Sequence, residues 1–312
     1  MRKVESQSIG AKAKRLKAAK TKKLLEKIEE NRNYCRALAD TYISLQKTRI
    51  ASFNRIHAIL RKSDEEEEIR ESVLNEIAKG LVEMEKKISK EAKNVLNDNP
   101  IYVEFLSKVK GLGNVLSLKL LSIKWDLDKP LGSWNAYAGL VPHVYKCKCK
   151  KGHKILLPFD PSNGNRIARC YFITDTKQNK KTKQTKFIRC GEVITKGEIA
   201  PCRKHKGYAI FWNPKVKTLF YLIGVSFAKT GKFYKNVYEK WKNIYLTIKG
   251  LKEGHAIKCG LRKAEKLFLA NFYQAYHEIL GLDYRDPYQF EYLKHDSGKK
   301  IKWTEVVEFD ES

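Results

Sequence analysis

Apolar residues recur at steps of three and four along residues 24–96, a spacing that places them on one face of a helix. The pattern is interrupted once, at Lys62-Ser63-Asp64, and therefore predicts two long helices. The apolar stripe of the second helix consists of Ile69, Val73, Ile77, Leu81, Met84, Ile88, Ala92 and Val95. Such a stripe fits either a hairpin that folds on itself or a coiled coil that joins two protomers.

The ends of these helices carry local signals. Ser63 or Asp64 is a suitable N-cap, and the glutamates at 65–68 would then lie in the first turn, where the helix dipole favours negative charge. Asn97-Asp98-Asn99-Pro100 ends the second helix. Residues 1–23 hold nine Lys or Arg against one Glu and few large apolar side chains, which predicts a mobile basic arm.

The rest of the chain alternates between helical and irregular patterns. Residues 131–142 contain small and aromatic side chains typical of a packed turn of helix and loop, and residues 144–208 contain only short, strand-like apolar runs. The helical period returns after Trp212-Asn213-Pro214, and a last helix is expected at about 261–280. We therefore expect a mainly α fold with a small β insert. The expected segments are a basic arm (1–23), a helical coiled-coil hairpin (24–98), a helix-hairpin-helix region (99–143), a Cys/His-rich insert (144–210), a further helical part (211–283) and a tail (284–312).

Charge narrows the function. The chain has 63 Lys and Arg against 35 Asp and Glu, a formal charge of +28. Nucleic acid is the simplest partner for such a surface, because binding releases the counterions of the polyanion. An anionic membrane is the rival, but no apolar run approaches the ~18 residues of a spanning helix. We expect a soluble cytoplasmic protein that binds DNA, with RNA as a second possibility.

A glycine-containing turn offers a phosphate site. Lys110-Gly111-Leu112-Gly113-Asn114 lies between two short apolar segments, an arrangement typical of a helix-hairpin-helix. Glycines permit φ > 0 in such a turn and leave backbone N–H groups of the next helix uncovered for a phosphate. Lys119 extends this candidate surface. An ordinary turn between two helices has the same pattern, so this alternative stays open.

Seven cysteines provide candidate metal ligands. Five of them lie between positions 147 and 202, and a clustered, odd number in a basic protein favours metal binding over disulfides. Two short clusters separated by hairpin-like sequence are typical of a zinc ribbon, with Cys170 between them. We expect a structural Zn²⁺ with two ligands from the first cluster and the remainder from the second; free buried thiols and a catalytic thiol are the alternatives. The candidate ligands are Cys147, Cys149 and His153 in the first cluster and Cys190, Cys202 and His205 in the second.

Three segments together resemble a known family. They are the hairpin at 109–121, the run Trp134-Asn-Ala-Tyr-Ala-Gly-Leu-Val-Pro142, and the helix start Asn213-Pro-Lys-Val-Lys-Thr-Leu219. Their order is similar to the C-terminal domain of the insertion sequence 110/116/902 transposases, and the resemblance covers about residues 100–280. The helices before it resemble the coiled coil that leads into that domain. The resemblance implies a recombinase ancestry and a basic helix that opens with Asn213. Lys215 and Lys217 in this helix are candidate phosphate contacts, because a cation near a groove needs no special pocket, and a merely solvated face is the alternative.

The chain departs from this family at its catalytic parts. The resemblance implies a RuvC-like N-terminal half with four metal-binding acidic residues, but residues 1–100 are helical and basic. It also implies a nucleophilic serine after Pro142, where His143-Val144-Tyr145 leads into the cysteines instead; Ser162 is the nearest serine in a turn-like setting. No catalytic residue can therefore be assigned, and Mg²⁺ would be needed only if catalysis survives.

Three functions remain open at this stage. The first is a DNA-binding protein built on a transposase-like scaffold. The second is an active recombinase that uses an unconventional nucleophile or a partner subunit. The third is a structural or genome-packaging protein whose coiled coil forms a homo-oligomer.

Overall fold

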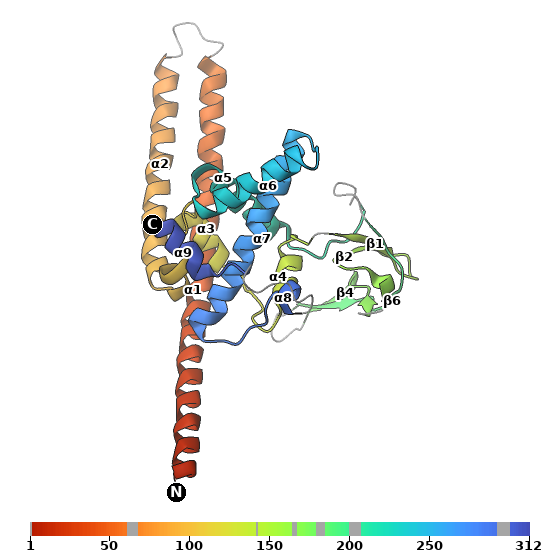
Figure 1. The fold of residues 1–312 in the computed structure, drawn as a ribbon. Coiled ribbons are helices and arrows are strands. Elements are labelled where there is room, and N and C mark those ends of the chain that lie inside the picture. Colours follow the sequence, from red (N-terminus) through yellow and green to blue (C-terminus); the bar gives the residue numbers. More distant parts are fainter. Residues whose placement is uncertain are drawn as a thin grey trace. The chain divides into compact units, whose positions relative to one another are not determined.

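The computed structural model describes residues 2–60, 68–141, 143–163, 167–178, 185–199, 207–291 and 300–312. The chain divides into two compact units, one formed by Met1–Asp128 with Leu222–Ser312 and the other by Lys129–Tyr221, called unit 1 and unit 2 below. Helices dominate the described residues, and the small sheets all lie in unit 2 (Figure 1). The expectation of a mainly α fold is thus confirmed.

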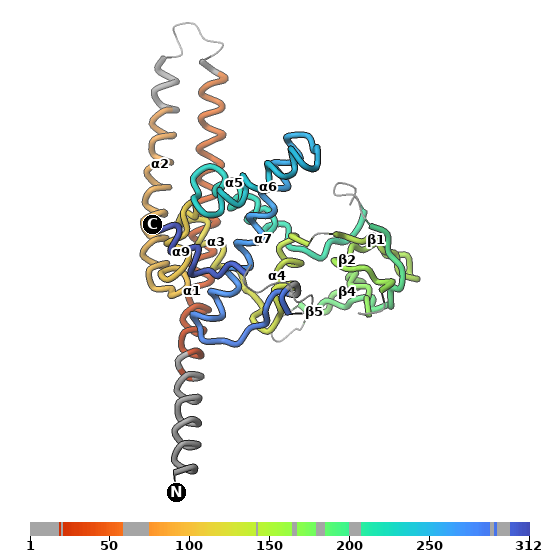
Figure 2. Tube along the Cα trace, viewed as in Figure 1, coloured from red at the N-terminus to blue at the C-terminus, as the bar shows by residue number. Residues whose placement is uncertain are grey.

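Unit 1 begins with two long helices, α1 (Arg2–Leu60) and α2 (Glu68–Asn97), which lie side by side and run in opposite directions (Figure 2). Arg49 of α1 donates to Glu85 of α2 at 2.7 Å, and Tyr34 donates to Glu91 at 3.2 Å. Residues buried at multiples of seven are Ile28, Cys35 and Ile56 on α1 and Ala78, Glu85 and Ala92 on α2, and Ala39 and Leu96 are buried four residues after Cys35 and Ala92. This spacing is the one that the contact line of a coiled coil shows.

The contact line differs from the predicted apolar stripe. Ile77 and Met84 were expected in the stripe but are 51% and 54% exposed, whereas Ala78 and Glu85 beside them are buried. The small side chain of alanine lets the two helices approach closely, so the burial follows size and position as well as hydrophobicity. The expected caps at Ser63 and Asp64, and the glutamates at 65–67, lie outside the described residues.

The N-terminal segment also differs from expectation. Helix α1 begins at Arg2, so residues 2–23, where a basic arm was expected, are part of this helix. Alanine and lysine, which fill much of this segment, have high helix propensity.

The predicted hairpin region follows α2. A helical turn, η2 (Tyr102–Leu106), precedes the glycine-containing turn, and α3 (Asn114–Leu121) follows it. Gly111 has a φ of +88°, and a Cβ built there would lie 2.9 Å from the Cα of Gly231. Glycine is therefore required at 111 both by conformation and by space.

The remaining helices complete unit 1 with a core of aromatic rings, among them Phe105, Phe227, Tyr234, Phe268 and Phe272. The helices are α5 (Pro214–Thr230), of which the residues from Leu222 onward belong to unit 1, α6 (Phe233–Thr247), α7 (Glu253–Leu280), α8 (Tyr288–Glu291) and α9 (Trp303–Glu311). Helix α7 starts eight residues before the predicted position of 261, and the expected tail contributes α8 and α9. Among the described helices, none combines the length and the apolar character needed to cross a membrane.

Unit 2 opens with a short helix, α4 (Leu131–Tyr137), as the packed turn at 131–142 predicted. The seven strands that follow form a three-stranded sheet in the order β2-β1-β7 and two antiparallel pairs, β3 with β6 and β4 with β5. They are β1 (Tyr145–Lys148), β2 (Lys154–Leu157), β3 (Ala168–Arg169), β4 (Ile173–Gln178), β5 (Thr185–Arg189), β6 (Val193–Ile194) and β7 (Glu198–Ile199). The expected short strands are thus present among the described residues between 145 and 199.

Candidate metal centre

The turn between β1 and β2 brings the first two ligand groups together. Cys149 follows β1 and His153 precedes β2, and Gly152 adopts a φ of +85° that closes the turn. The backbone N–H of Cys149 donates to the carbonyl of His153 at 3.1 Å, and that of Gly152 donates to the carbonyl of Cys149 at 2.9 Å. As a result, Sγ of Cys149 lies 3.4 Å from Nδ1 of His153.

The second pair of ligand groups lies where two strand pairs meet. Cys170 joins β3 to β4, and Cys190 joins β5 to β6. Cys170 N–H donates to the carbonyl of Glu192 at 2.8 Å, Gly191 N–H to the carbonyl of Cys170 at 2.9 Å, and Cys190 N–H to the carbonyl of Phe172 at 2.9 Å. These bonds hold the two cysteines opposite each other.

The two pairs converge into one group. The sulfur atoms of Cys149, Cys170 and Cys190 and a ring nitrogen of His153 all lie within 4.8 Å of one another. The ring of His153 stacks on Phe172 with centroids 4.4 Å apart and an interplanar angle of 7°, which fixes its orientation. Three sulfurs and one imidazole in this arrangement could hold a metal ion.

The surroundings of Cys149 favour a thiolate there. Burial raises the pKa of the Cys149 thiol, but backbone N–H groups of His153 and Lys151 and the thiols of Cys170 and Cys190 donate to its sulfur and lower the pKa overall. At Cys170, burial and the neighbouring thiols instead raise the pKa to about 11. A bound cation would reverse this second effect, because metal coordination deprotonates a thiol.

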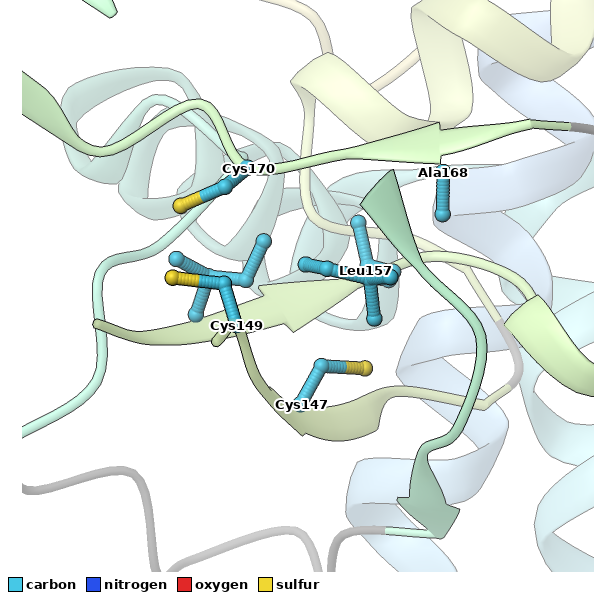
Figure 3. Close-up of a cluster of buried hydrophobic side chains, with 7 residues drawn as sticks. Cys147, Cys149, Leu157, Ala168 and Cys170 are labelled. Carbon is cyan, nitrogen blue, oxygen red and sulfur yellow. The ribbon is translucent and has the colours of Figure 1, made fainter. Parts of the chain in front are cut away.

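Cys147 lies apart from this group. Figure 3 shows its sulfur pointing to the side opposite the sulfurs of Cys149 and Cys170, among buried apolar side chains. A Cβ built at Gly197 would lie 2.7 Å from the sulfur of Cys147, so the thiol is closely packed. Burial, with a smaller contribution from the charge of Asp160, raises the pKa of Cys147 to about 11. Cys147 thus contributes to the small core of unit 2.

The predicted ligands therefore have different outcomes. The structure brings Cys149, His153 and Cys190 together and places Cys147 elsewhere. Cys202 and His205 lie outside the described residues. The fourth member, Cys170, was not among the chosen ligands. A signal for it existed, because Cys170 and Cys190 flank a hairpin-like run and therefore meet at its base.

Two backbone groups of the predicted phosphate-binding turn have partners within unit 1. Lys110 N–H donates to Oδ2 of Asp310 at 2.9 Å, and the carbonyl of Gly111 accepts from the hydroxyl of Ser226 at 2.6 Å. Gly113 has a φ of −78° and precedes α3, while Oδ1 of Asn114 accepts from the hydroxyl of Tyr102. Lys119 is half-buried in α3. The N–H of Lys110 is thus already used by a carboxylate.

The other predicted nucleic-acid residues lie at the start of α5. Oδ1 of Asn213 accepts the N–H groups of Lys215 and Val216 at 3.0 and 3.4 Å, which makes Asn213 an N-cap. Its amide donates to the hydroxyl of Tyr137 at 2.9 Å, which joins this segment to α4. The ammonium of Lys217 lies 4.4 Å above the ring of Trp212. Lys215 is exposed.

Gly139 lets the segment after α4 lie close to the start of α5. It has a φ of +68°, and a Cβ there would lie 2.9 Å from the side chain of Lys217 and 3.2 Å from that of Trp212. Two of the three segments that resemble the transposase domain therefore contact each other within unit 2.

Ser162 has a local role in the structure. It is exposed in the turn Pro161–Asn163, and its hydroxyl donates to Oδ1 of Asp160 at 2.6 Å. This is the pattern of an Asp-led turn.

Comparison of the chain with protein-family models finds no match. Comparison with the curated proteins likewise finds no similar sequence.

Proposed function

We propose that this protein binds DNA through a zinc-stabilised, strongly basic unit 2, and that its scaffold is related to the C-terminal domain of the insertion sequence 110/116/902 transposases. The observation that carries the proposal is the distribution of charge. Residues 129–221 contain 20 Lys or Arg against four Asp or Glu, a net of +16 out of +28 for the whole chain. More than half of the excess positive charge is thus attached to less than a third of the residues, around the Cys₃His group.

Zinc is the metal that fits the ligand set best. Three thiolates and one imidazole are a common tetrahedral zinc environment, whereas Mg²⁺ and Ca²⁺ prefer oxygen ligands. With four protein ligands the ion keeps no open position, which is typical of structural rather than catalytic zinc. The described part of unit 2 has a small core, and a structural ion would supply the stability that the core lacks.

Metal analysis of two matched variants tests the zinc site. Cys149→Ala and Cys147→Ala each remove one buried sulfur from the same strand region. We expect about one zinc per chain in the wild type and in Cys147→Ala, and a loss of most of the zinc in Cys149→Ala. Equal zinc contents in the two variants, or a wild type without zinc after expression in zinc-supplemented medium, would contradict the assignment.

Binding measurements at several salt concentrations test the nucleic-acid function. We expect the wild type to bind short DNA duplexes with an affinity that falls by about 10³-fold or more between ~50 and ~200 mM salt, as for a protein that contacts six or more phosphates. A protein without affinity for duplex DNA, duplex RNA and single strands at low salt would refute the proposal.

Zinc removal connects the two parts of the proposal. If the zinc site organises the DNA-binding surface, the Cys149→Ala variant loses affinity and Cys147→Ala keeps it. Full DNA affinity in a zinc-free Cys149→Ala variant would separate the metal from the binding function.

The relation to transposases rests on the three sequence segments and on the contact between two of them. Asn213 and Gly139, which the resemblance singles out, both serve that contact. We propose a binding protein rather than a nuclease, since the chemistry of strand transfer requires a positioned nucleophile and none is assigned among the described residues. Incubation with supercoiled DNA and Mg²⁺ should therefore give retarded DNA without nicks. Nicked or joined products that disappear in Ser162→Ala would instead establish a recombinase.

A further inference from the structure

A two-stranded ribbon, β4 with β5, extends from the candidate zinc centre. All six residues of β4 and every residue of β5 except the half-buried Ile188 are exposed. Among the described residues no third strand pairs with the ribbon. The ribbon therefore has little core of its own, and an isolated pair of strands is only marginally stable in water.

The base of the ribbon coincides with the candidate metal ligands. Cys170 precedes it and Cys190 follows it, and the hydrogen bond from Cys190 N–H to the carbonyl of Phe172 is the first cross-strand link. Arg169, just before Cys170, also donates to the carbonyl of Gly191 at 3.3 Å. A metal ion held by both cysteines would thus clamp the two strands where they leave the rest of unit 2.

The positive charges of the ribbon do not stabilise its fold. Lys177 lies directly opposite Lys186 in the ladder, and like charges in that position destabilise a sheet. Residues 171–189 contain six Lys or Arg and a single acidic residue, Asp175. An exposed ribbon whose lysine pair forms no ion pair with the residues that the structure describes is suited to a partner that carries negative charge.

We propose that the β4–β5 ribbon is the element that enters the major groove of duplex DNA, with the face that bears Lys177 and Lys186 directed to the DNA. This inference rests on the proposed function. The major groove of B-DNA is wide enough to admit a two-stranded ribbon, whereas the major groove of duplex RNA is too deep and narrow for side chains to read. Directly paired residues share a face, so Lys177 and Lys186 project together, while Thr176 and Phe187 project from the other face.

The test compares two double variants of equal charge. Lys177→Gln with Lys186→Gln removes two charges from the ribbon, and Lys240→Gln with Lys249→Gln removes two exposed charges from unit 1. We expect the ribbon variant to bind a DNA duplex at least about tenfold more weakly, with the slope of log K against log salt reduced by about two. The control variant should change affinity less than about threefold. Zinc content equal to that of the wild type shows that the ribbon variant keeps its folded base.

A second measurement locates the groove. Methylation of guanine N7, which lies in the major groove, should interfere with binding, and a duplex RNA of the same sequence should bind at least about tenfold more weakly than the DNA. Equal affinity for the duplex RNA, or no interference from N7 methylation, would overturn the major-groove assignment.

The outcomes separate the two proposals. A wild type that binds DNA while the ribbon and control variants behave alike would overturn the role of the ribbon and leave the proposed function intact. A wild type that binds no nucleic acid would overturn both.

Discussion

The α1–α2 hairpin and the cysteine-containing part of unit 2 reach a folded state by different means. The hairpin repeats one contact every seven residues and uses small side chains such as Ala78 and Ala92 to bring two long helices together. In the part of unit 2 that the structure describes, the strands enclose a cluster of seven buried residues, three of which are cysteines. With the proposed ion bound, ligand bonds would do in unit 2 what the repeated side-chain contacts do in the hairpin.

Metal removal should produce the largest effect and should act on one region alone. Structural zinc in zinc-finger peptides contributes about 10–16 kcal/mol, as much as the whole stability of a typical domain. After treatment with a strong chelator, we expect the amide hydrogens of β1, β2, β3 and β6 to lose their protection in hydrogen-exchange mass spectrometry. The amides of residues 24–56 in α1 should keep theirs. Equal loss in both regions would show that they do not fold by separate means.

Substitution of Asp310 should produce the second largest effect, a loss of stability in the helices of unit 1. This carboxylate is 1% exposed and accepts the N–H groups of Lys110 at 2.9 Å and Phe233 at 2.8 Å. Asp310→Ala leaves both groups without an acceptor and should lower the free energy of unfolding by about 2–5 kcal/mol. Urea titration followed by the helical circular dichroism signal measures this loss.

The neighbour of Asp310 supplies the control. Among the described residues the ion-pair partner of Glu311 is Lys108, at 3.5 Å and with both side chains well exposed, so Glu311→Ala should cost less than about 1 kcal/mol. Zinc content should be the same in both variants, since neither residue lies in unit 2. Similar losses in the two variants would contradict a special role for Asp310.

Substitution of Glu85 tests the contact line between α1 and α2. It is 7% exposed and pairs with Arg49 of α1, so Glu85→Gln weakens a charge-assisted bond in a low-dielectric place and should cost about 1–3 kcal/mol. Glu83→Gln on the same helix removes an equal charge from an exposed pair with Lys86 and should cost less than about 0.5 kcal/mol. Thermal unfolding of both variants measures the difference between their losses of stability. A larger loss in Glu83→Gln than in Glu85→Gln would contradict the assignment of Glu85 to the contact line.

The smallest effect on folding is expected at Ile77 and Met84, which are about half exposed on α2. A coiled coil between protomers stays a prediction, and these two residues are its natural contacts. The double change Ile77→Gln with Met84→Gln should keep the unfolding free energy within about 0.5 kcal/mol of the wild-type value, because both residues lie outside the buried contact line. Analytical ultracentrifugation should show the wild type as an oligomer and the variant as a monomer. A monomeric wild type would contradict the coiled coil between protomers.

Sequence patterns predicted the helices better than their contacts. Periodicity alone indicated two long helices, but it assigned Ile77 and Met84 to the buried face because it weighs hydrophobicity. The buried face instead uses Ala78 and Glu85 at these places, whereas Ala92, which the predicted stripe included, is buried as expected. Helix packing favours small residues such as the two alanines where helices approach closely. The start of α1 was missed because residues 2–23 have no apolar stripe, although their helix propensity is high.

The candidate metal site could be predicted only where its ligands are close in sequence. Cys149 and His153 are close in sequence and share one turn, so their proximity follows from local structure. Cys170 and Cys190 are brought together by the pairing of β4 with β5, so their proximity follows only once the run between them is recognised as a hairpin. Asp310 was invisible for the same reason, because its two donors lie 200 and 77 residues away in the chain.

The two bonds of Asp310 also bear on the order of events during synthesis. Lys110 leaves the ribosome 200 residues before the carboxylate that will accept its amide hydrogen. At ~5–20 residues per second, the turn around Gly111 waits about 10–40 s for its partner. Residues 129–221 are all made during this interval, before the carboxylate of Asp310 exists. The turn around Gly111 is therefore among the last parts of unit 1 to gain its complete set of hydrogen bonds, although it is made early.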